Sequence, residues 1–184
     1  EKANKIKIID KILVSTDSKK IIDSLDKKKV DIIIKRPKYL SNSNVAKFDV
    51  WKHALKNAEI ITNSKYDFLL DIDCSNPLQT IETIKNFISK SLLKNKKKGK
   101  FDGSLHICEA RKNPYFNLLE KKKDYLIISK KIKNTIKSRQ KAPKVYEHVG
   151  GSYLMKRDFL IKSKNLFQGK IIGVPISKKE SFDI

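Results

Sequence analysis

The sequence is poor in the residue types that mark several common kinds of site. It holds only two cysteines, Cys74 and Cys108, which stand far apart and so give neither a disulfide framework nor a metal-ligand spacing. No apolar run approaches the length needed to span a membrane, and neither a signal peptide nor a glycine-rich phosphate-binding loop is visible. These absences favour a cytoplasmic protein without a membrane segment.

Acidic residues and arginines are also scarce. The chain has 20 Asp and Glu against 42 basic residues, of which 38 are lysine and only four are arginine, so its formal net charge is +22. Such a charge suggests nucleic-acid binding, but proteins that read bases rely on arginine for bidentate contacts. We therefore favour solvated lysine-rich faces over a nucleic-acid partner, while expecting the charge to attract anionic ligands such as nucleotides.

What the sequence does contain is an alternation of apolar runs and amphipathic stretches. The strands that we expect cover residues 11–15, 31–35, 68–72, 104–108, 151–155 and 170–174. The expected helices cover residues 18–25, 46–61 and 80–93. This alternation predicts an α/β fold with a mostly parallel sheet covered on both faces. Lys94–Lys100 should form an exposed turn, and residues 120–145 an irregular or hairpin-like segment.

The chain shows no internal linker or repeat, so we expect one domain over residues 1–184. A doubly wound fold usually begins with a strand that carries a phosphate-binding loop. No such strand and loop is recognisable here, and the last residues follow directly on a strand and turn. We therefore expect the domain to be incomplete at both ends, with the N-terminal strand and loop missing.

The most informative stretch is the apolar run Phe68–Ile72, which leads into Asp71, Asp73 and a polar turn. Ligands of open α/β sheets bind beyond the carboxyl ends of the strands, so this is where a site is expected. We expect the Asp71 and Asp73 side chains to diverge, so that they do not bind one ion together. Asp73, nearer the loop, is the better candidate, with a carboxylate satisfied by the amides of its own turn as the alternative.

Several short motifs occur in an order typical of one family. They are Val14-Ser15-Thr16-Asp17-Ser18, Arg36-Pro37-x-x-Leu40, Ser75-Asn76-Pro77-Leu78-Gln79, Asn113-Pro114-Tyr115, Arg139-Gln140-x-x-Pro143-x-x-Tyr146, Gly151-Ser152-Tyr153 and Ser181-x-Asp183-Ile184. Together they resemble the acylneuraminate cytidylyltransferases, which include the CMP-sialic acid synthetases. The resemblance covers essentially the whole chain. Lys47 and the segment around Asp73 look closer to relatives that activate legionaminic acid and other bacterial sialic-acid-like sugars.

The resemblance implies a Rossmann-like nucleotidyltransferase fold, a three-layer sandwich. It implies transfer of CMP from CTP to an acidic nine-carbon 2-keto sugar, with release of pyrophosphate. It also implies a divalent metal, Mg²⁺ or Mn²⁺, and a homodimer whose sugar pockets lie near the interface. Two other functions stay open: a basic nucleic-acid-binding domain of Rossmann-like fold without turnover, and a sugar-nucleotide-binding relative that has lost activity.

The loss of activity stays open because the chain departs from the commonest family pattern at a few positions. Asp73 stands where sialic acid enzymes usually have Gln, and Gln79 replaces the arginine at the end of the same motif. Ser43 replaces an aspartate, and Val149 with Gly150 replaces a pair that usually begins with Asn. These departures bear on the sugar that is used and, to a lesser extent, on activity itself.

Asp183 matches the first aspartate of the family's closing motif. The resemblance therefore implies that Asp183 binds the metal and is catalytic through it. A carboxylate is a preferred ligand of Mg²⁺. On the sequence alone, the cap of a following helix is the favoured interpretation of Asp183, and the resemblance is what shifts the balance to the metal. Asp73 takes a position that contacts the nucleotide or the sugar.

The resemblance also assigns roles to four basic or polar side chains. Arg36, directly after a strand, is expected at the nucleotide. Lys47, at the start of a helix, suits a phosphate or carboxylate, although a solvated lysine is an open alternative. Arg139 is expected to be catalytic and to bind the sugar together with Gln140, because its planar guanidinium suits carboxylate or phosphate.

Overall fold

The computed structural model describes residues 1–98, 101–132 and 136–184. The α-helices are α1 (Lys19–Ser24), α2 (Lys47–Thr62), α3 (Ile81–Lys98) and α4 (Arg157–Lys162). The strands are β1 (Leu13–Thr16), β2 (Ile32–Lys35), β3 (Phe68–Ile72), β4 (Gly103–Glu109), β5 (Leu119–Lys122), β6 (Tyr125–Ile128), β7 (Tyr146–Lys156) and β8 (Ile171–Pro175). Short 3-10 turns include η1 (Ala3–Lys5) and η3 (Arg139–Lys141). No helix among the described residues is long and apolar enough to cross a membrane.

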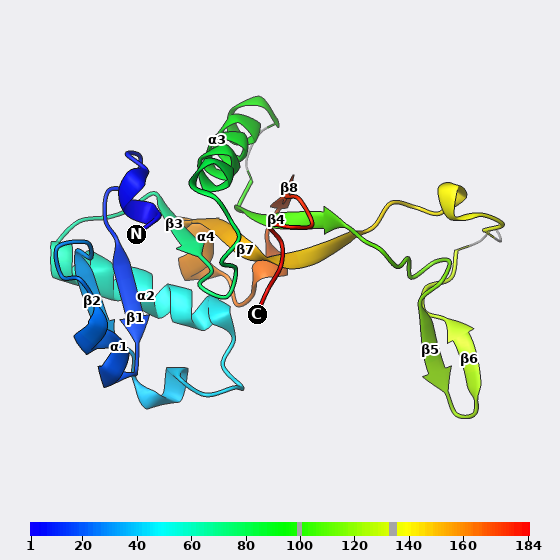
Figure 1. Ribbon diagram of the computed structural model, residues 1–184, viewed down its shortest axis with the longest axis horizontal. Coiled ribbons are helices and arrows are strands. Elements are labelled where there is room, and N and C mark those ends of the chain that lie inside the picture. The colour runs from blue at the N-terminus through cyan, green and yellow to red at the C-terminus, as the bar shows by residue number, and fades with distance from the viewer. Residues whose placement is uncertain (99–100, 133–135) are drawn as a thin grey trace.

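The central sheet has four strands in the order β3-β7-β4-β8 (Figure 1). β8 runs parallel to β4, whereas β7 runs antiparallel to both of its neighbours. β1 and β2 form a separate parallel pair, and β5 and β6 form an antiparallel hairpin. The predicted α/β class is confirmed, but the sheet is mixed because the long strand β7 enters it in reverse.

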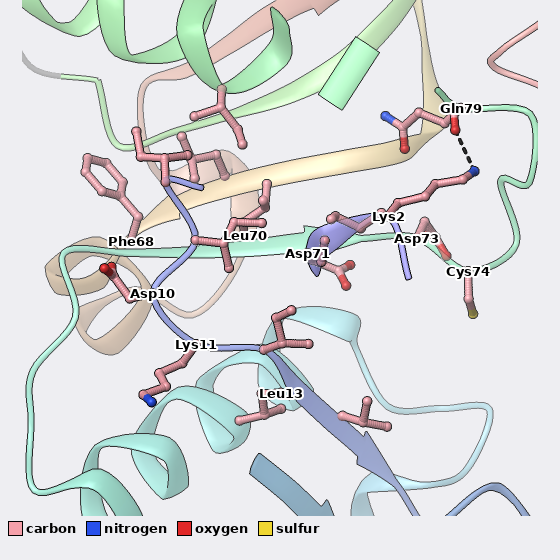
Figure 2. Close-up of a pocket in the computed structure, with 18 of the residues that line it drawn as sticks. Lys2, Asp10, Lys11, Leu13, Phe68, Leu70, Asp71, Asp73, Cys74 and Gln79 are labelled. Atoms are coloured by element: carbon pink, nitrogen blue, oxygen red, sulfur yellow. Dashed lines mark hydrogen bonds between the residues drawn. The ribbon is translucent and has the colours of Figure 1, made fainter. Parts of the chain in front are cut away.

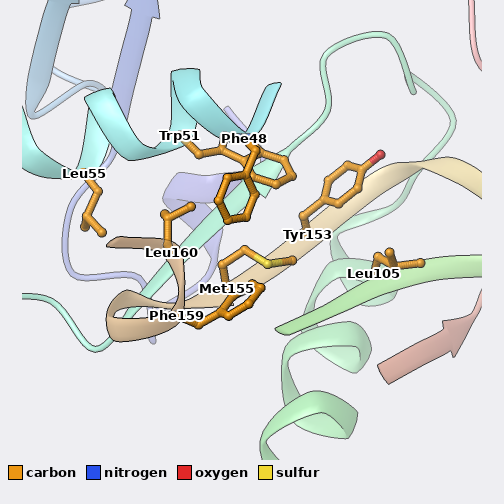
Figure 3. Packing of buried hydrophobic residues seen from close by; sticks show 8 residues of the cluster. All are labelled: Phe48, Trp51, Leu55, Leu105, Tyr153, Met155, Phe159 and Leu160. Carbon is orange, nitrogen blue, oxygen red and sulfur yellow. The ribbon is translucent and has the colours of Figure 1, made fainter. Parts of the chain in front are cut away.

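Helices cover both faces of the four-stranded sheet. On one face, α2 and α4 contribute Phe48, Trp51 and Phe159 to a buried cluster that contains Met155 of β7 (Figure 3). On the other face, Leu154 of β7 packs with Ile84, Phe87 and Ile88 of α3. Met155 and Leu154 are neighbours on one strand, so their side chains point to opposite faces. The result is the expected arrangement of three layers.

Helix α3 corrects one prediction. The expected turn over Lys94–Lys100 is wrong over its first part, because α3 continues through Lys98; residues 99–100 lie outside the described part. Lysine is a good helix former, so a run of lysines prolongs an amphipathic helix where no glycine or proline stops it. High charge alone did not indicate a turn.

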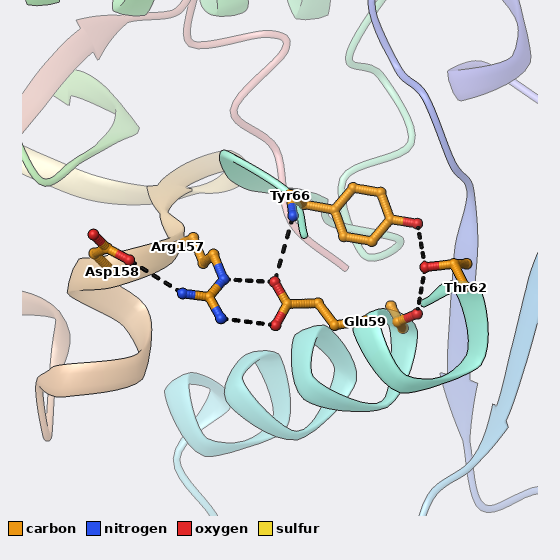
Figure 4. A network of polar contacts seen from close by, with 6 residues as sticks. Glu59, Thr62, Tyr66, Arg157 and Asp158 are labelled. Carbon is orange, nitrogen blue, oxygen red and sulfur yellow. Dashed lines mark hydrogen bonds and ion pairs between the residues drawn. The ribbon is translucent and has the colours of Figure 1, made fainter. Parts of the chain in front are cut away.

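An ion-pair network joins α2 to the start of α4, directly after β7 (Figure 4). Arg157 donates from Nε to Glu59 Oε1 at 2.6 Å and from Nη2 to Glu59 Oε2 at 3.0 Å. The Tyr66 amide donates to the same Glu59 carboxylate at 3.4 Å, and the Tyr66 hydroxyl donates to Thr62 Oγ1 at 3.0 Å. This fork-to-fork pairing fixes α2, and thus the position of Lys47 at its start, against the sheet.

The segment between β4 and β7 leaves the body of the molecule as an arm (Figure 1). Its hairpin confirms a hairpin-like segment near residue 120, while residues 133–135 lie outside the described part. Leu119, Tyr125 and Leu126 of the hairpin are 51%, 73% and 67% exposed. An isolated two-stranded hairpin is at best marginally stable in water, so these apolar side chains leave the arm short of packing partners.

A gap separates the parallel β1-β2 pair from the mixed four-stranded sheet. β1 pairs with β2 and β3 pairs with β7, so the facing edges of β1 and β3 have no strand between them in the described part of the chain. Cavities of about 840 and 640 Å³ open on this gap, both lined by Leu13, Leu70 and Asp71. Figure 2 shows the larger cavity, with Leu13 on one side and Leu70 and Asp71 on the other.

Candidate active site

The centre of the candidate site is an ion cluster at the carboxyl end of β3. The Lys47 ammonium, on the first residue of α2, lies 2.8 Å from Asp71 Oδ2 and 2.6 Å from Asp73 Oδ2. The expected divergence of Asp71 and Asp73 is therefore wrong. Residues two apart along a strand share one face, and both carboxylates reach the same lysine.

The electrostatics of this cluster favour the charged forms of Lys47 and Asp73. Burial lowers the pKa of Lys47, but Asp71 and Asp73 outweigh it and raise that pKa above its usual range. Burial likewise raises the pKa of Asp73, and hydrogen bonds from Lys47 and Ser75 outweigh it, so that pKa is lowered. Ser75 donates its hydroxyl to Asp73 Oδ1 at 3.1 Å. The Asp73 carboxylate is thus bound in part by its own turn, as the alternative interpretation predicted, and in part by Lys47.

Aromatic rings that the sequence did not single out surround Lys47. Its Nζ lies 4.8 Å from the centre of the Tyr153 ring and 5.8 Å from that of Trp51, which are cation–π distances. His148 meets Tyr153 edge to face at 5.5 Å. Burial raises the pKa of Tyr153, whereas burial and the nearby Lys47 charge lower the pKa of His148. Tyr153 belongs to a recognised motif, but no local pattern marks Trp51 or His148 as site residues.

Arg36 lies at the same rim, directly after β2. Its Nη2 donates to the Ser15 carbonyl at 2.5 Å and its Nε to Ser15 Oγ at 3.4 Å, which anchors the guanidinium at the end of β1. The 640 Å³ cavity is lined by Arg36 and Ser15 together with Lys47, Asp71 and Asp73. The structure thus brings three of the predicted nucleotide-binding residues to one cavity.

Asp183 reaches the same region from the other end of the chain. The Asn76 side chain donates to the Phe182 carbonyl at 2.8 Å, and the Ile184 amide donates to the Ser75 carbonyl at 3.0 Å. These bonds hold the residues on both sides of Asp183 against the turn that follows Asp73. A Cβ on Gly150 would lie 3.3 Å from the Asp183 carboxylate, so the glycine leaves room for it.

The predicted metal role of Asp183 depends on whether its carboxylate is available. It is exposed and makes no hydrogen bond or ion pair with the described residues. No cluster of three or more His, Cys, Asp or Glu able to hold a metal occurs among those residues. Mg²⁺ commonly binds one or two carboxylates and completes its shell with phosphate oxygens and water. A single free carboxylate fits that pattern, whereas Asp71 and Asp73 are already occupied by Lys47.

The structure does not bring Arg139 and Gln140 to this cluster within one chain. They lie in η3 on the arm, where Arg139 donates from Nη2 to the Arg111 carbonyl at 3.3 Å. Their roles at the sugar stay predictions.

Solved structures define the class of this fold. A CMP:2-keto-3-deoxy-manno-octonic acid synthetase complexed with CTP matches 95% of this chain and 76% of its own, with a TM-score of 0.56 and 11% identity. A 4-diphosphocytidyl-2C-methyl-D-erythritol synthase from Anaerococcus prevotii matches 100% of this chain and 79% of its own, with a TM-score of 0.57 and 13% identity. The fold is therefore that of the nucleotidyltransferases.

Curated relatives narrow this class to a family. The chain is 32% identical over 184 residues to post-translational flagellin modification protein B of Campylobacter coli. It is also 32% identical over 183 residues to the CMP-N,N'-diacetyllegionaminic acid synthase of Campylobacter jejuni. Each match covers 99% of this chain and 74% of the relative, whereas no protein-family model matches. The chain belongs to the acylneuraminate cytidylyltransferase family that its motifs resemble.

Proposed function

We propose that this protein transfers CMP from CTP to an acidic nine-carbon 2-keto sugar of the legionaminic acid type and releases pyrophosphate. The observation that carries the proposal is the convergence of Arg36, Lys47, Asp73 and Asp183 on one rim of the sheet, where α/β folds bind ligands. The named activity of the legionaminic relative supports the choice of sugar. The two free cysteines, one exposed and one buried, suit a cytoplasmic enzyme.

In this proposal, the chain's own residues position the reactants and balance their charge. Arg36 faces the nucleotide from the end of β2, and Asp73 faces the nucleotide or the sugar while Lys47 holds it in place. Asp183 would hold Mg²⁺ or Mn²⁺, and such an ion, when bound, neutralises charge on the phosphates. Phosphoryl transfer is largely a matter of positioning and electrostatics, so a rim of fixed charges is suited to it.

We further propose a homodimer in which the arm of one chain meets the site of the other. The exposed Leu119, Tyr125 and Leu126 supply an apolar surface for the contact. Such a contact would bring Arg139 and Gln140, which lie far along the arm, to the sugar of the partner. This arrangement supports their predicted roles without requiring the arm to fold back.

The gap between β1 and β3 supports the expectation of a further strand. In the described part of the chain, the facing edges of β1 and β3 have no strand between them, and cavities lined by apolar and charged side chains open there. Open edges of this kind are normally paired or covered. We propose that the phosphate-binding strand implied by the family runs between them, so that its loop opens beside Lys47 and Arg36. Slow hydrogen exchange along both edges in the full-length protein would support this; fast exchange there would contradict it.

The activity is tested by following pyrophosphate release from CTP with the full-length protein. We expect release only when a divalent ion and a nine-carbon 2-keto acid are both present, with legionaminic acid preferred to sialic acid. The Asp183→Asn variant should lose most of the metal-dependent rate. Absence of release with every such sugar would contradict the proposed reaction, and binding of CTP without turnover would favour the inactive relative.

A further inference from the structure

A buried polar cluster lies beneath the candidate site and takes no direct part in it. His106 of β4 and Gln79 are each 1% exposed, and Ser152 of β7 is fully buried. Gln79 Nε2 donates to Ser152 Oγ at 2.9 Å and lies 3.1 Å from His106 Nδ1. Buried polar groups are costly unless they are paired, so a set placed at the centre of the sheet calls for an explanation.

The cluster supports an irregularity in β7. Leu105 pairs with Tyr153, yet Ile107, two residues on, pairs with His148, so β7 has extra residues between these two pairs. Bulges of this kind redirect side chains and often lie beside active sites. Gly151 within the bulge has a φ of 141°, and a Cβ there would lie only 2.8 Å from His106 Nδ1. The imidazole and the glycine therefore fit against each other.

His106 holds this bulge as a hydrogen-bond acceptor. Its Nδ1 accepts the Ser152 amide at 3.0 Å, which requires Nδ1 to be unprotonated and places the single proton of a neutral ring on Nε2. Burial lowers the pKa of His106 to about 4, consistent with a neutral ring at neutral pH. The ring also packs on Phe87 at 4.4 Å.

The bulge in turn contacts both candidate carboxylate residues. The Gly151 carbonyl accepts the Asp73 amide at 2.7 Å, which fixes the backbone at the end of β3. Gly150 lies against the Asp183 carboxylate. A displacement of the bulge would therefore move Asp73 and Asp183 together, and errors of about 1 Å can reduce a rate on the order of 100-fold.

We propose that His106 is a positioning residue of the active site, which sets Asp73 and Asp183 through the β7 bulge. The proposal rests on the proposed function for its effect on turnover. It also assigns a role to Gln79, which replaces the arginine of the family motif. Gln79 belongs to this buried support through its contacts with Ser152 and His106.

Two variants separate positioning from packing. His106→Asn retains an acceptor close to the place of Nδ1 but loses the ring, whereas His106→Phe retains the ring against Phe87 but loses the acceptor. If His106 acts by positioning, we expect His106→Asn to keep kcat within about threefold, and His106→Phe to lower it about 10- to 100-fold. A purely structural ring predicts the reverse order, and that result would overturn the proposal.

Hydrogen exchange at the Asp73 and Ser152 amides provides a readout that does not depend on turnover. We expect exchange at both amides to accelerate at least about tenfold in His106→Phe and to stay near the wild-type rate in His106→Asn. Unchanged protection in His106→Phe would refute the proposal even if the variant had lost activity. If His106→Phe does not fold, nitrogen NMR of the wild-type ring decides, because a proton on Nδ1 would exclude the acceptor role.

Discussion

At the scale of single residues, Lys47 illustrates how context decides the role of a common side chain. The chain has 38 lysines, and the sequence alone does not distinguish Lys47 from a solvated one. The fold places it between two carboxylates and over an aromatic ring. Two carboxylates this close repel each other, and the positive charge of Lys47 between them offsets that repulsion.

Replacing Lys47 by Gln should therefore change the properties of Asp73 while leaving the protein folded. We expect the pKa of Asp73 to rise, since its partner charge is lost while its burial remains, and the KM for CTP to rise about 10- to 100-fold. Carboxyl NMR titration and steady-state kinetics measure the two effects. Lys56→Gln, an exposed position on the same helix, is the matched control, and an equal effect there would contradict a specific role.

At the scale of elements, one carboxylate ties the C-terminal segment after β8 to helix α3. Glu180 accepts hydrogen bonds from Thr83 Oγ1, from Ser177 Oγ at 2.9 Å and from the Thr80 amide at 3.4 Å, so it ties the segment to the start of α3. The hydrogen bond from Thr83, followed by those from Ser177 and Thr80, lowers the pKa of Glu180 despite the opposing effect of burial. A carboxylate at a helix N-terminus is also favoured by the helix dipole.

Glu180→Ala should release the segment that carries Asp183. We expect faster hydrogen exchange at the Ile184 amide, a several-fold higher Mg²⁺ concentration for half-maximal activity, and a loss of about 1 kcal/mol in the free energy of unfolding. Glu180→Gln retains an acceptor and should be milder. Glu82→Ala is the matched control. It removes a carboxylate from the first turn of α3 that accepts a hydrogen bond from Asn86, and it should leave the Mg²⁺ requirement unchanged.

At the scale of the whole molecule, His106 makes stability depend on pH. Its pKa is about 4 when folded, against 6.5 as the ordinary value, chiefly because of burial; Lys90 also lowers it, while Glu180 opposes the shift. The unfolded chain then binds more protons between these values, so stability falls as pH falls from 6.5 to 4.

The size of this effect can be measured by denaturant unfolding. The shift corresponds to a loss on the order of 3 kcal/mol in the free energy of unfolding across that pH interval. The His106→Asn variant lacks the titrating group and should lose correspondingly less. An equal pH dependence in both proteins would show that other groups dominate.

The proposed dimer is tested by mixing two inactive variants. Arg139→Ala should disable the arm and Asp183→Asn the metal ligand, each in every site of its homodimer. If the arm acts on the partner's site, a mixed dimer regains one intact site, so an equal mixture should recover about a quarter of wild-type activity. No recovery after subunit exchange, confirmed by mass spectrometry, would place Arg139 in its own chain's site or outside any site.

The sequence by itself determined the α/β class and the family, and it predicted roles for Asp73 and Asp183. Strand and helix periodicity and motif order are local properties, and they survive without knowledge of the packing. Gly151 and Gln79 could be recognised only as motif members or departures, because nothing local shows that they meet His106.

Only the tertiary structure decided how distant segments meet. It reversed the direction of β7, brought Lys47 to both aspartates, set Asp183 beside the turn after Asp73, and placed Arg139 on an arm away from them. These outcomes depend on strand pairing and on charges from separate elements, whose energies are defined only when the chain is folded. The roles of Asp73, Asp183 and Lys47 stay predictions, and the structure adds to them the aromatic rings and the buried histidine that no local pattern indicated.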